Sequence, residues 1–138
     1  MELSTTQTLN YYFFTKNEYF SQQRHLFSYA RSFNQPIESW NTGNVTNMNG
    51  MFYKALSFNQ LIDSWNTEKV TDMKFMFFDA KSFNQPLNNW DIRKVKCMTS
   101  MFHGPRRLTS ACSLKNLANG PLWRRSTLEI NSGGCLLN

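Results

Sequence analysis

With 138 residues, the chain is long enough for one domain with a modest core, and its formal net charge is +6. That charge points to nucleic acid only where it is concentrated, yet residues 26–103 hold eight Lys or Arg against six Asp or Glu. No apolar stretch has the length of a transmembrane helix, so the sequence predicts no transmembrane segment.

Residues 1–25 match the repeat that follows only weakly, and we expect them to form a degraded repeat or an N-terminal cap. The start of the chain, from Met1 to Thr5, has no basic region followed by an apolar run. A secretory signal peptide is therefore not expected in this chain.

Residues 26–103 repeat every 25 residues, because Ser-Phe-Asn-Gln begins at residues 32, 57 and 82. A half repeat precedes the first full one, with Leu26-Phe27 in the place of Met51-Phe52. Such a period is typical of a solenoid, in which each repeat forms one coil and stacks on the next. The sequence therefore predicts about three and a half coils.

Each coil is expected to contain a short strand and a short helix, which makes the predicted fold class an α/β repeat. The Ser-Phe-Asn-Gln-Pro-Ile segment, residues 32–37, has the composition of an extended strand whose pairing is interrupted at Pro36. From Met48 to Ala55, apolar residues recur at i, i+3, i+4 and i+7, which favours about two helical turns.

Stacked coils place equivalent residues about 4.8 Å apart, so each repeated position becomes a column of like side chains. We expect the aromatic columns to form the core and the Asn column to bond backbone groups of neighbouring coils. A binding role for the Trp column is the alternative, because aromatic ladders also recognise carbohydrates and peptides. These structural ladders are Phe33, Phe58 and Phe83; Asn34, Asn59 and Asn84; Trp40, Trp65 and Trp90; and Phe52, Phe77 and Phe102.

The variable positions of the repeat are where a binding function would have to lie, because the ladder residues are committed to stacking. One variable column is aromatic and could present a partly exposed strip to a protein partner. The alternative is that its members are rim residues of the predicted helical face. The candidate partner contacts are Tyr53, Phe78 and His103 of this column, together with Glu38, Asp63, Glu68 and Arg93 of two charged columns.

The residues needed for catalysis do not come together in the sequence. His25 and His103 occupy different repeat positions, and there is no Gly-rich phosphate loop. The cysteines Cys97, Cys112 and Cys135 have no zinc or redox spacing. We therefore expect a protein that is not an enzyme and has no catalytic residue, metal site, cofactor or small-molecule substrate.

Beyond His103 the repeat is lost, and residues 104–138 are expected to form a basic, irregular tail with five Lys or Arg against one Glu. Its pairs Arg106-Arg107 and Arg124-Arg125 are isolated, which favours a solvated tail over a nucleic-acid patch.

The repeated landmarks resemble a known family. Val-Thr-Asn-Met-x-x-Met-Phe-x-x-Ala, residues 45–55, and Phe-Asn-Gln-Pro-Ile-x-x-Trp-Asn-Thr, residues 33–42, are similar to the BspA-like leucine-rich-repeat surface proteins. More narrowly, they resemble the repeat of bacterial surface lipoproteins that is catalogued as a domain of unknown function. The resemblance implies a short leucine-rich-repeat-type solenoid, displayed on the cell surface or outside the cell and used for adhesion or protein binding.

The leading hypothesis is a non-catalytic module that presents its stacked surface to a protein or glycan partner. The first alternative is a nucleic-acid binder that uses the basic tail, with the repeats as scaffold. The second is a structural fragment of a longer surface protein.

Overall fold

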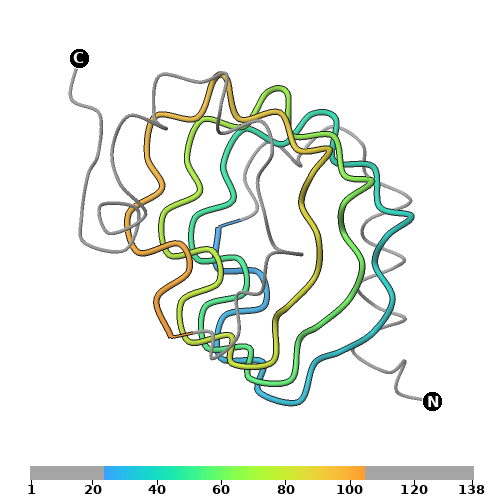
Figure 1. Ribbon diagram of the computed structural model, residues 1–138, viewed down its shortest axis with the longest axis vertical. Coiled ribbons are helices and arrows are strands. Elements are labelled where there is room, and N and C mark those ends of the chain that lie inside the picture. The colour runs from blue at the N-terminus through green and yellow to red at the C-terminus, as the bar shows by residue number, and fades with distance from the viewer. Residues whose placement is uncertain (1–23, 105–138) are drawn as a thin grey trace.

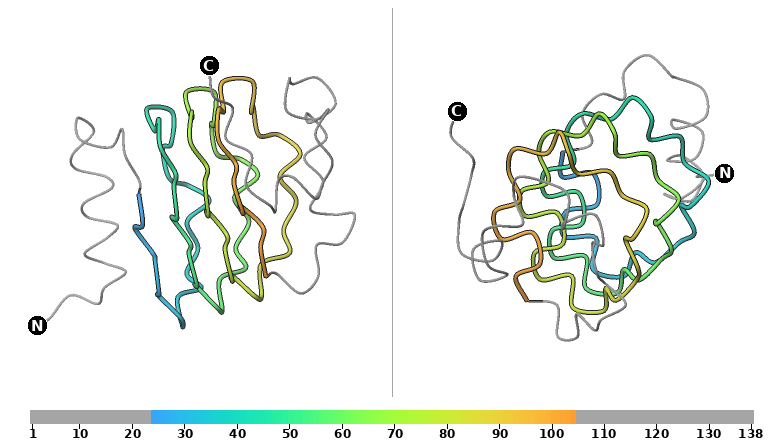
Figure 2. Two further views of the ribbon diagram at one scale, coloured as in Figure 1. Left: turned by 90° about the vertical axis from the view of Figure 1, so that its left-hand side faces the viewer. Right: turned by 45° about the horizontal axis from the view of Figure 1, so that its top comes forward.

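The computed structural model of the chain describes residues 24–104. In this range the backbone winds into coils that lie over one another (Figure 1). Seen edge-on, the coils stand side by side as layers in sequence order (Figure 2). Residues 25 apart are neighbours, since Asn47 pairs with Asp72 and Asp72 with Cys97 in parallel bridges. Each 25-residue repeat is therefore one coil.

The coils are made of turns and irregular backbone. Residues 24–104 contain no helix, and their only β pairing is the isolated bridges at Asn47, Asp72 and Cys97. The predicted α/β repeat, a leucine-rich-repeat-type solenoid with a strand and a helix in each coil, is therefore wrong. Neither the strand expected over residues 32–37 nor the helix expected from Met48 to Ala55 is formed.

The helix fails because of two left-handed residues in every repeat. We call residues 49–56, with their equivalents 24–31, 74–81 and 99–104, the turn segment. Gly50 and Lys54 have φ values of 60° and 56°, and Phe75 and Asp79 repeat them at 56° each. An α-helix needs φ near −63° at every residue, so a left-handed residue at every fourth position breaks it.

Amides of the turn segment donate alternately to their own coil and to the next. The amides of Gly50, Phe52 and Lys54 donate to the backbone carbonyls of the following coil at 2.8, 2.9 and 2.7 Å. Those of Tyr53 and Ala55 donate three residues back within the coil, both at 3.0 Å. The apolar spacing that suggests a helix is thus produced by successive turns, each tied to its neighbour in the stack.

On another side of the coil, the bonds between coils run through side chains. We call residues 33–42, with their equivalents 58–67 and 83–92, the ladder segment. The Asn59 amide donates to Asn34 Oδ1 at 2.8 Å, and Trp65 Nε1 donates to the carbonyl of Ile37 at 3.0 Å. Neither of these bonds needs a backbone N–H at the repeat position of Pro36. The segment therefore accommodates Pro36, which has no backbone N–H to donate.

The core lies inside the coils and consists of stacked rings. Phe52 is sandwiched at 5.4 Å from Phe27 and 5.6 Å from Phe77, and it packs 3.8 Å from Phe58 within its own coil. Val, Ile, Met and Ala columns fill the space around the rings. No buried side-chain nitrogen or oxygen of the described residues lacks a hydrogen-bond partner. Burial in the core therefore leaves none of these polar atoms unsatisfied.

Two parts of the predicted organisation fall almost entirely outside the described residues. They are the N-terminal cap, residues 1–25, and the basic tail, residues 104–138, of which Arg24, His25 and Gly104 are described. Cys97 is 8% exposed and takes part in a disulfide bond. In residues 24–104 no helix has the length and apolar character to cross a membrane.

We expect Trp65→Ala to lower the free energy of unfolding by ~3–5 kcal/mol. The indole is 2% exposed, lies 6.2 Å from Trp40, and donates to the Ile37 carbonyl. Glu68→Ala is the matched control, because its side chain is exposed, and it should cost less than about 0.5 kcal/mol. Urea denaturation measures both, and equal tolerance would show that the Trp column is not core.

Gly50→Ala should also destabilise the stack, by ~1–3 kcal/mol. Gly50 has a positive φ, and an added Cβ would overlap the imidazole ring of His25 in the preceding coil. His25→Ala in the same chain should recover the steric part of the loss and leave the backbone part. If the double variant is no more stable than Gly50→Ala, the imidazole does not pack where the structure places it.

Candidate functional site

A column of rings lies on the outside of the turn segment. Tyr53, Phe78 and His103 each follow a buried Phe of the core, and their own side chains are half-buried or exposed. The rings of Tyr53 and Phe78 stack with centroids 5.0 Å apart, and those of Phe78 and His103 at 4.8 Å. The structure thus brings together the three aromatic residues that the sequence singles out.

Two further rings extend this column. Tyr29, whose side chain is 57% exposed, lies 5.4 Å from Tyr53, and Phe75 meets Phe78 edge to face at 5.8 Å. We call Tyr29, Tyr53, Phe75, Phe78 and His103 the aromatic strip. Sequence reasoning missed Tyr29 and Phe75, because they stand in other repeat columns beside Lys, Gly and Ser. Their left-handed backbone carries them to the strip, and no sequence signal marks it.

Lysine ammonium groups cover parts of the aromatic strip. Lys54 Nζ lies 5.5 Å from the centroid of Tyr29 and 5.4 Å from that of Tyr53. Lys74 Nζ lies 5.0 Å from the centroid of Phe75. Cation–π contacts of this kind are worth about 0.5–1 kcal/mol at exposed sites. They hold two positive charges against the rings.

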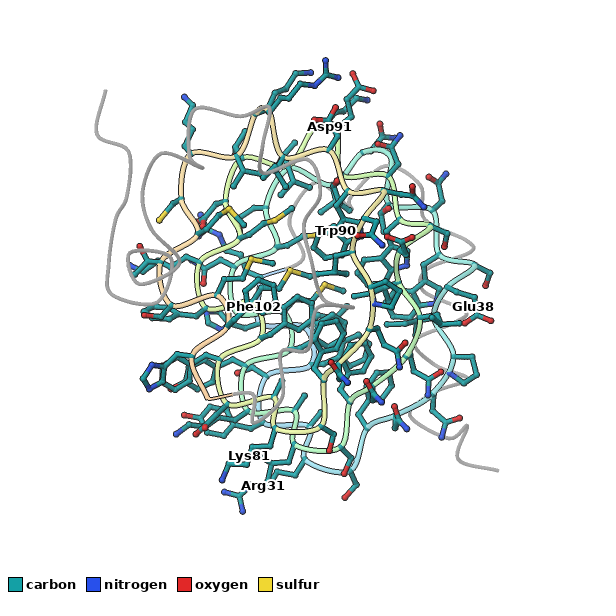
Figure 3. The ribbon with its side chains drawn as sticks, in the orientation of Figure 1. Arg31, Glu38, Lys81, Trp90, Asp91 and Phe102 are labelled. Atoms are coloured by element: carbon teal, nitrogen blue, oxygen red, sulfur yellow. The ribbon has the colours of Figure 1, made fainter. Side chains whose placement is uncertain are left out.

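The charged candidates of the sequence lie elsewhere, and most are bonded within the stack. The Asp63 carboxylate accepts bonds from the amide and Nδ2 of Asn89, at 2.9 and 2.7 Å. Glu68 pairs with Lys94 at 3.6 Å, and Glu38 is exposed. In Figure 3 Glu38 projects from a different side of the stack than Arg31 and Lys81, which share one corner.

Arg93, the fourth charged candidate, is held by Asp91. Its Nη2 donates to Asp91 Oδ2 at 2.6 Å, and its amide donates to Asp91 Oδ1 at 3.0 Å. The hydrogen bond from the Arg93 side chain, followed by the one from its amide, lowers the pKa of Asp91 to about 2. The guanidinium is thus occupied by its neighbour in the same turn.

The ladder residues are occupied by the stack itself. The rings of Phe33, Phe58 and Phe83 lie 6.0 and 5.8 Å apart, and the Asn84 amide donates to Asn59 Oδ1 at 2.9 Å. Trp90 Nε1 donates to the carbonyl of Ile62 at 2.9 Å, and both Trp90 and Phe102 point inward (Figure 3). Trp40 is buried as well. These columns hold the coils together, whereas the rings of the aromatic strip face outward.

Within residues 24–104, no cluster of three His, Cys, Asp or Glu is arranged to hold a metal ion. The arrangement of the described residues offers apolar ring edges and ammonium groups on one surface.

The stacked 25-residue coils define the chain as a tandem-repeat protein. A family model described as "Mycoplasma protein of unknown function, DUF285" matches residues 10–117, well over half of the chain. The chain belongs to this family. No curated protein and no solved structure matches it.

We expect Arg93→Ala to raise the pKa of Asp91 from about 2 toward the ordinary 3.8. The return is incomplete, because residue 93 keeps the amide that donates to Asp91. Because the folded pKa is depressed, the pair contributes its stability above pH 3.8 and loses it as the pH falls toward 2. NMR titration of the Asp91 carboxyl measures the shift, and an unchanged pKa in the variant would contradict the assignment.

Proposed function

We propose that the protein is a non-catalytic interaction module that binds a partner through the aromatic strip. The observation that carries the proposal is that this strip runs continuously over successive coils on the outside of the stack. Tyr and Phe are enriched at protein interfaces, and Tyr is among the residue types that dominate binding energy there. A row of rings that does not serve the core is therefore best explained by binding.

The geometry of the stack supports a flat, extended contact. Successive coils of the turn segment are joined by hydrogen bonds of 2.7–2.9 Å that backbone amides donate, so the backbone holds the rings at fixed spacing. A rigid row of rings loses little conformational entropy on binding, because its rotamers are already fixed by stacking. Such a strip suits a partner segment that runs along the stack.

The resemblance to the BspA-like surface proteins supports a cellular location for this interaction. If the resemblance extends to location, the module acts at the cell surface or outside the cell, in adhesion or protein contact. The leucine-rich-repeat class of that family does not carry over, because the coils lack its strand and helix. The family match itself has no assigned function.

We expect Phe78→Ser to abolish the capture of a partner from extracts of cell-surface proteins. The ring is at the middle of the strip, stacked on both sides, and its removal interrupts the row. Leu61→Ser is the matched control, because Leu61 is 57% exposed in the ladder segment, away from the strip. Quantitative mass spectrometry of material retained by the immobilised full chain gives the comparison.

The expected result is at least one protein retained by the wild type and by Leu61→Ser but lost with Phe78→Ser. Circular dichroism checks that both variants keep the wild-type fold. Equal retention by all three chains would sink the proposal, since binding would then not depend on the strip.

A further inference from the structure

Charge is divided between the two sides of the stack. The turn segment carries five basic residues and one acidic residue, Asp79, for a net charge of +4. The rest of the described chain carries four basic and five acidic residues, for a net charge of −1. The aromatic strip thus lies within the basic side. Its basic residues are Arg24, Arg31, Lys54, Lys74 and Lys81.

Within residues 24–104, none of these five cations forms an ion pair with a carboxylate. Among residues 24–104, the ion pairs are Arg93–Asp91 and Lys94–Glu68, both outside the turn segment. Arg24, Arg31 and Lys81 are exposed, and Lys54 and Lys74 rest on rings, which leaves their remaining donors for a ligand. A surface with a net charge of +4 favours an anionic partner.

The stacking of the strip distinguishes between anionic partners. Proteins that bind single-stranded nucleic acid stack bases on exposed ring faces. Here Phe78 has Tyr53 at 5.0 Å and His103 at 4.8 Å against its two faces. Lys54 lies over the rings of Tyr29 and Tyr53, and Lys74 lies over the ring of Phe75. Phe78, at the middle of the strip, therefore offers its ring edge, which carries partial positive charge, and the two lysines add ammonium groups.

We propose that the aromatic strip and the five basic residues of the turn segment bind an acidic segment of a partner protein. Carboxylates of the segment pair with the ammonium and guanidinium groups, and its apolar side chains lie on the ring edges. Arg24 and Lys74 stand two coils apart in one column, as do Arg31 and Lys81, which places each pair about 10 Å apart along the stack. The segment is expected to run along the stack axis and to meet the cations in turn.

This inference rests on the proposed function and names the partner's chemistry. Its test is fluorescence anisotropy with the full chain and an 18-residue labelled peptide of Glu-Glu-Leu repeats. The comparison probes are the same peptide with Gln for Glu, an 18-residue poly-Glu peptide and an 18-nucleotide oligo(dT). We expect binding to the Glu-Glu-Leu peptide, weaker binding to poly-Glu, and none to the Gln peptide.

The decisive variant is Lys54→Gln with Lys74→Gln, which should weaken binding of the Glu-Glu-Leu peptide at least fivefold. The matched control is Lys69→Gln with Lys94→Gln, which removes the same charge from the other side and should change affinity less than twofold. Asp79→Asn removes the single acid of the turn segment and should strengthen binding. Raising the salt from 50 to 300 mM should weaken binding, because exposed charges are screened over about 10 Å at 0.1 M.

Each outcome of these experiments either supports or overturns the inference. Equal losses in the two lysine pairs, or binding of oligo(dT) as tight as that of the Glu-Glu-Leu peptide, would overturn the inference and leave a general anion-binding surface or a nucleic-acid site. Absence of peptide binding would also overturn it. If a partner from cell-surface extracts still depends on Phe78 in that case, the proposed function stands and only its acidic chemistry is wrong.

Discussion

The rest of the structure depends on the alternation of amide donors in the turn segment. One amide closes a turn within its coil, and the next donates to the coil above, so the same eight residues both bend the chain and join the layers. In a helix all these amides would donate within the same segment, and in a strand they would donate to a neighbour without bending the chain. The left-handed residues make the compromise, and they recur at every fourth position with or without glycine, as His25, Phe75 and Ser100 show.

This arrangement also places the candidate site. Within the turn segment, Phe52 and Ala55 point into the core while Tyr53 and Lys54 between them point outward. The regularity that stacks Phe52 on Phe77 therefore also stacks Tyr53 on Phe78. Lys54 and Asp79 share another outward column at the left-handed position. Core packing and surface display are set by the same backbone register, so the strip needs no separate support.

The 25-residue register, the columns of like residues and the aromatic column of Tyr53, Phe78 and His103 follow directly from the sequence. They depend on which residues are equivalent, and Ser-Phe-Asn-Gln fixes that equivalence. The local conformation could not be predicted. Apolar spacing of three and four residues from Met48 to Ala55 is common to a helix and to a series of turns, and Phe75 or Lys54 in a left-handed position leaves no compositional mark. For the same reason the sequence does not predict that Tyr29 and Phe75 belong to the strip.

Because each coil offers the same contacts above and below, an in-frame gain or loss of 25 codons inserts or removes a complete layer without disturbing its neighbours. Recombination between repeats in this register would give products made of whole coils. Every added layer would lengthen the row of rings by one and carry the contact zone further from the first coil. Reach and avidity could thus be tuned by copy number alone, with no change to any single residue.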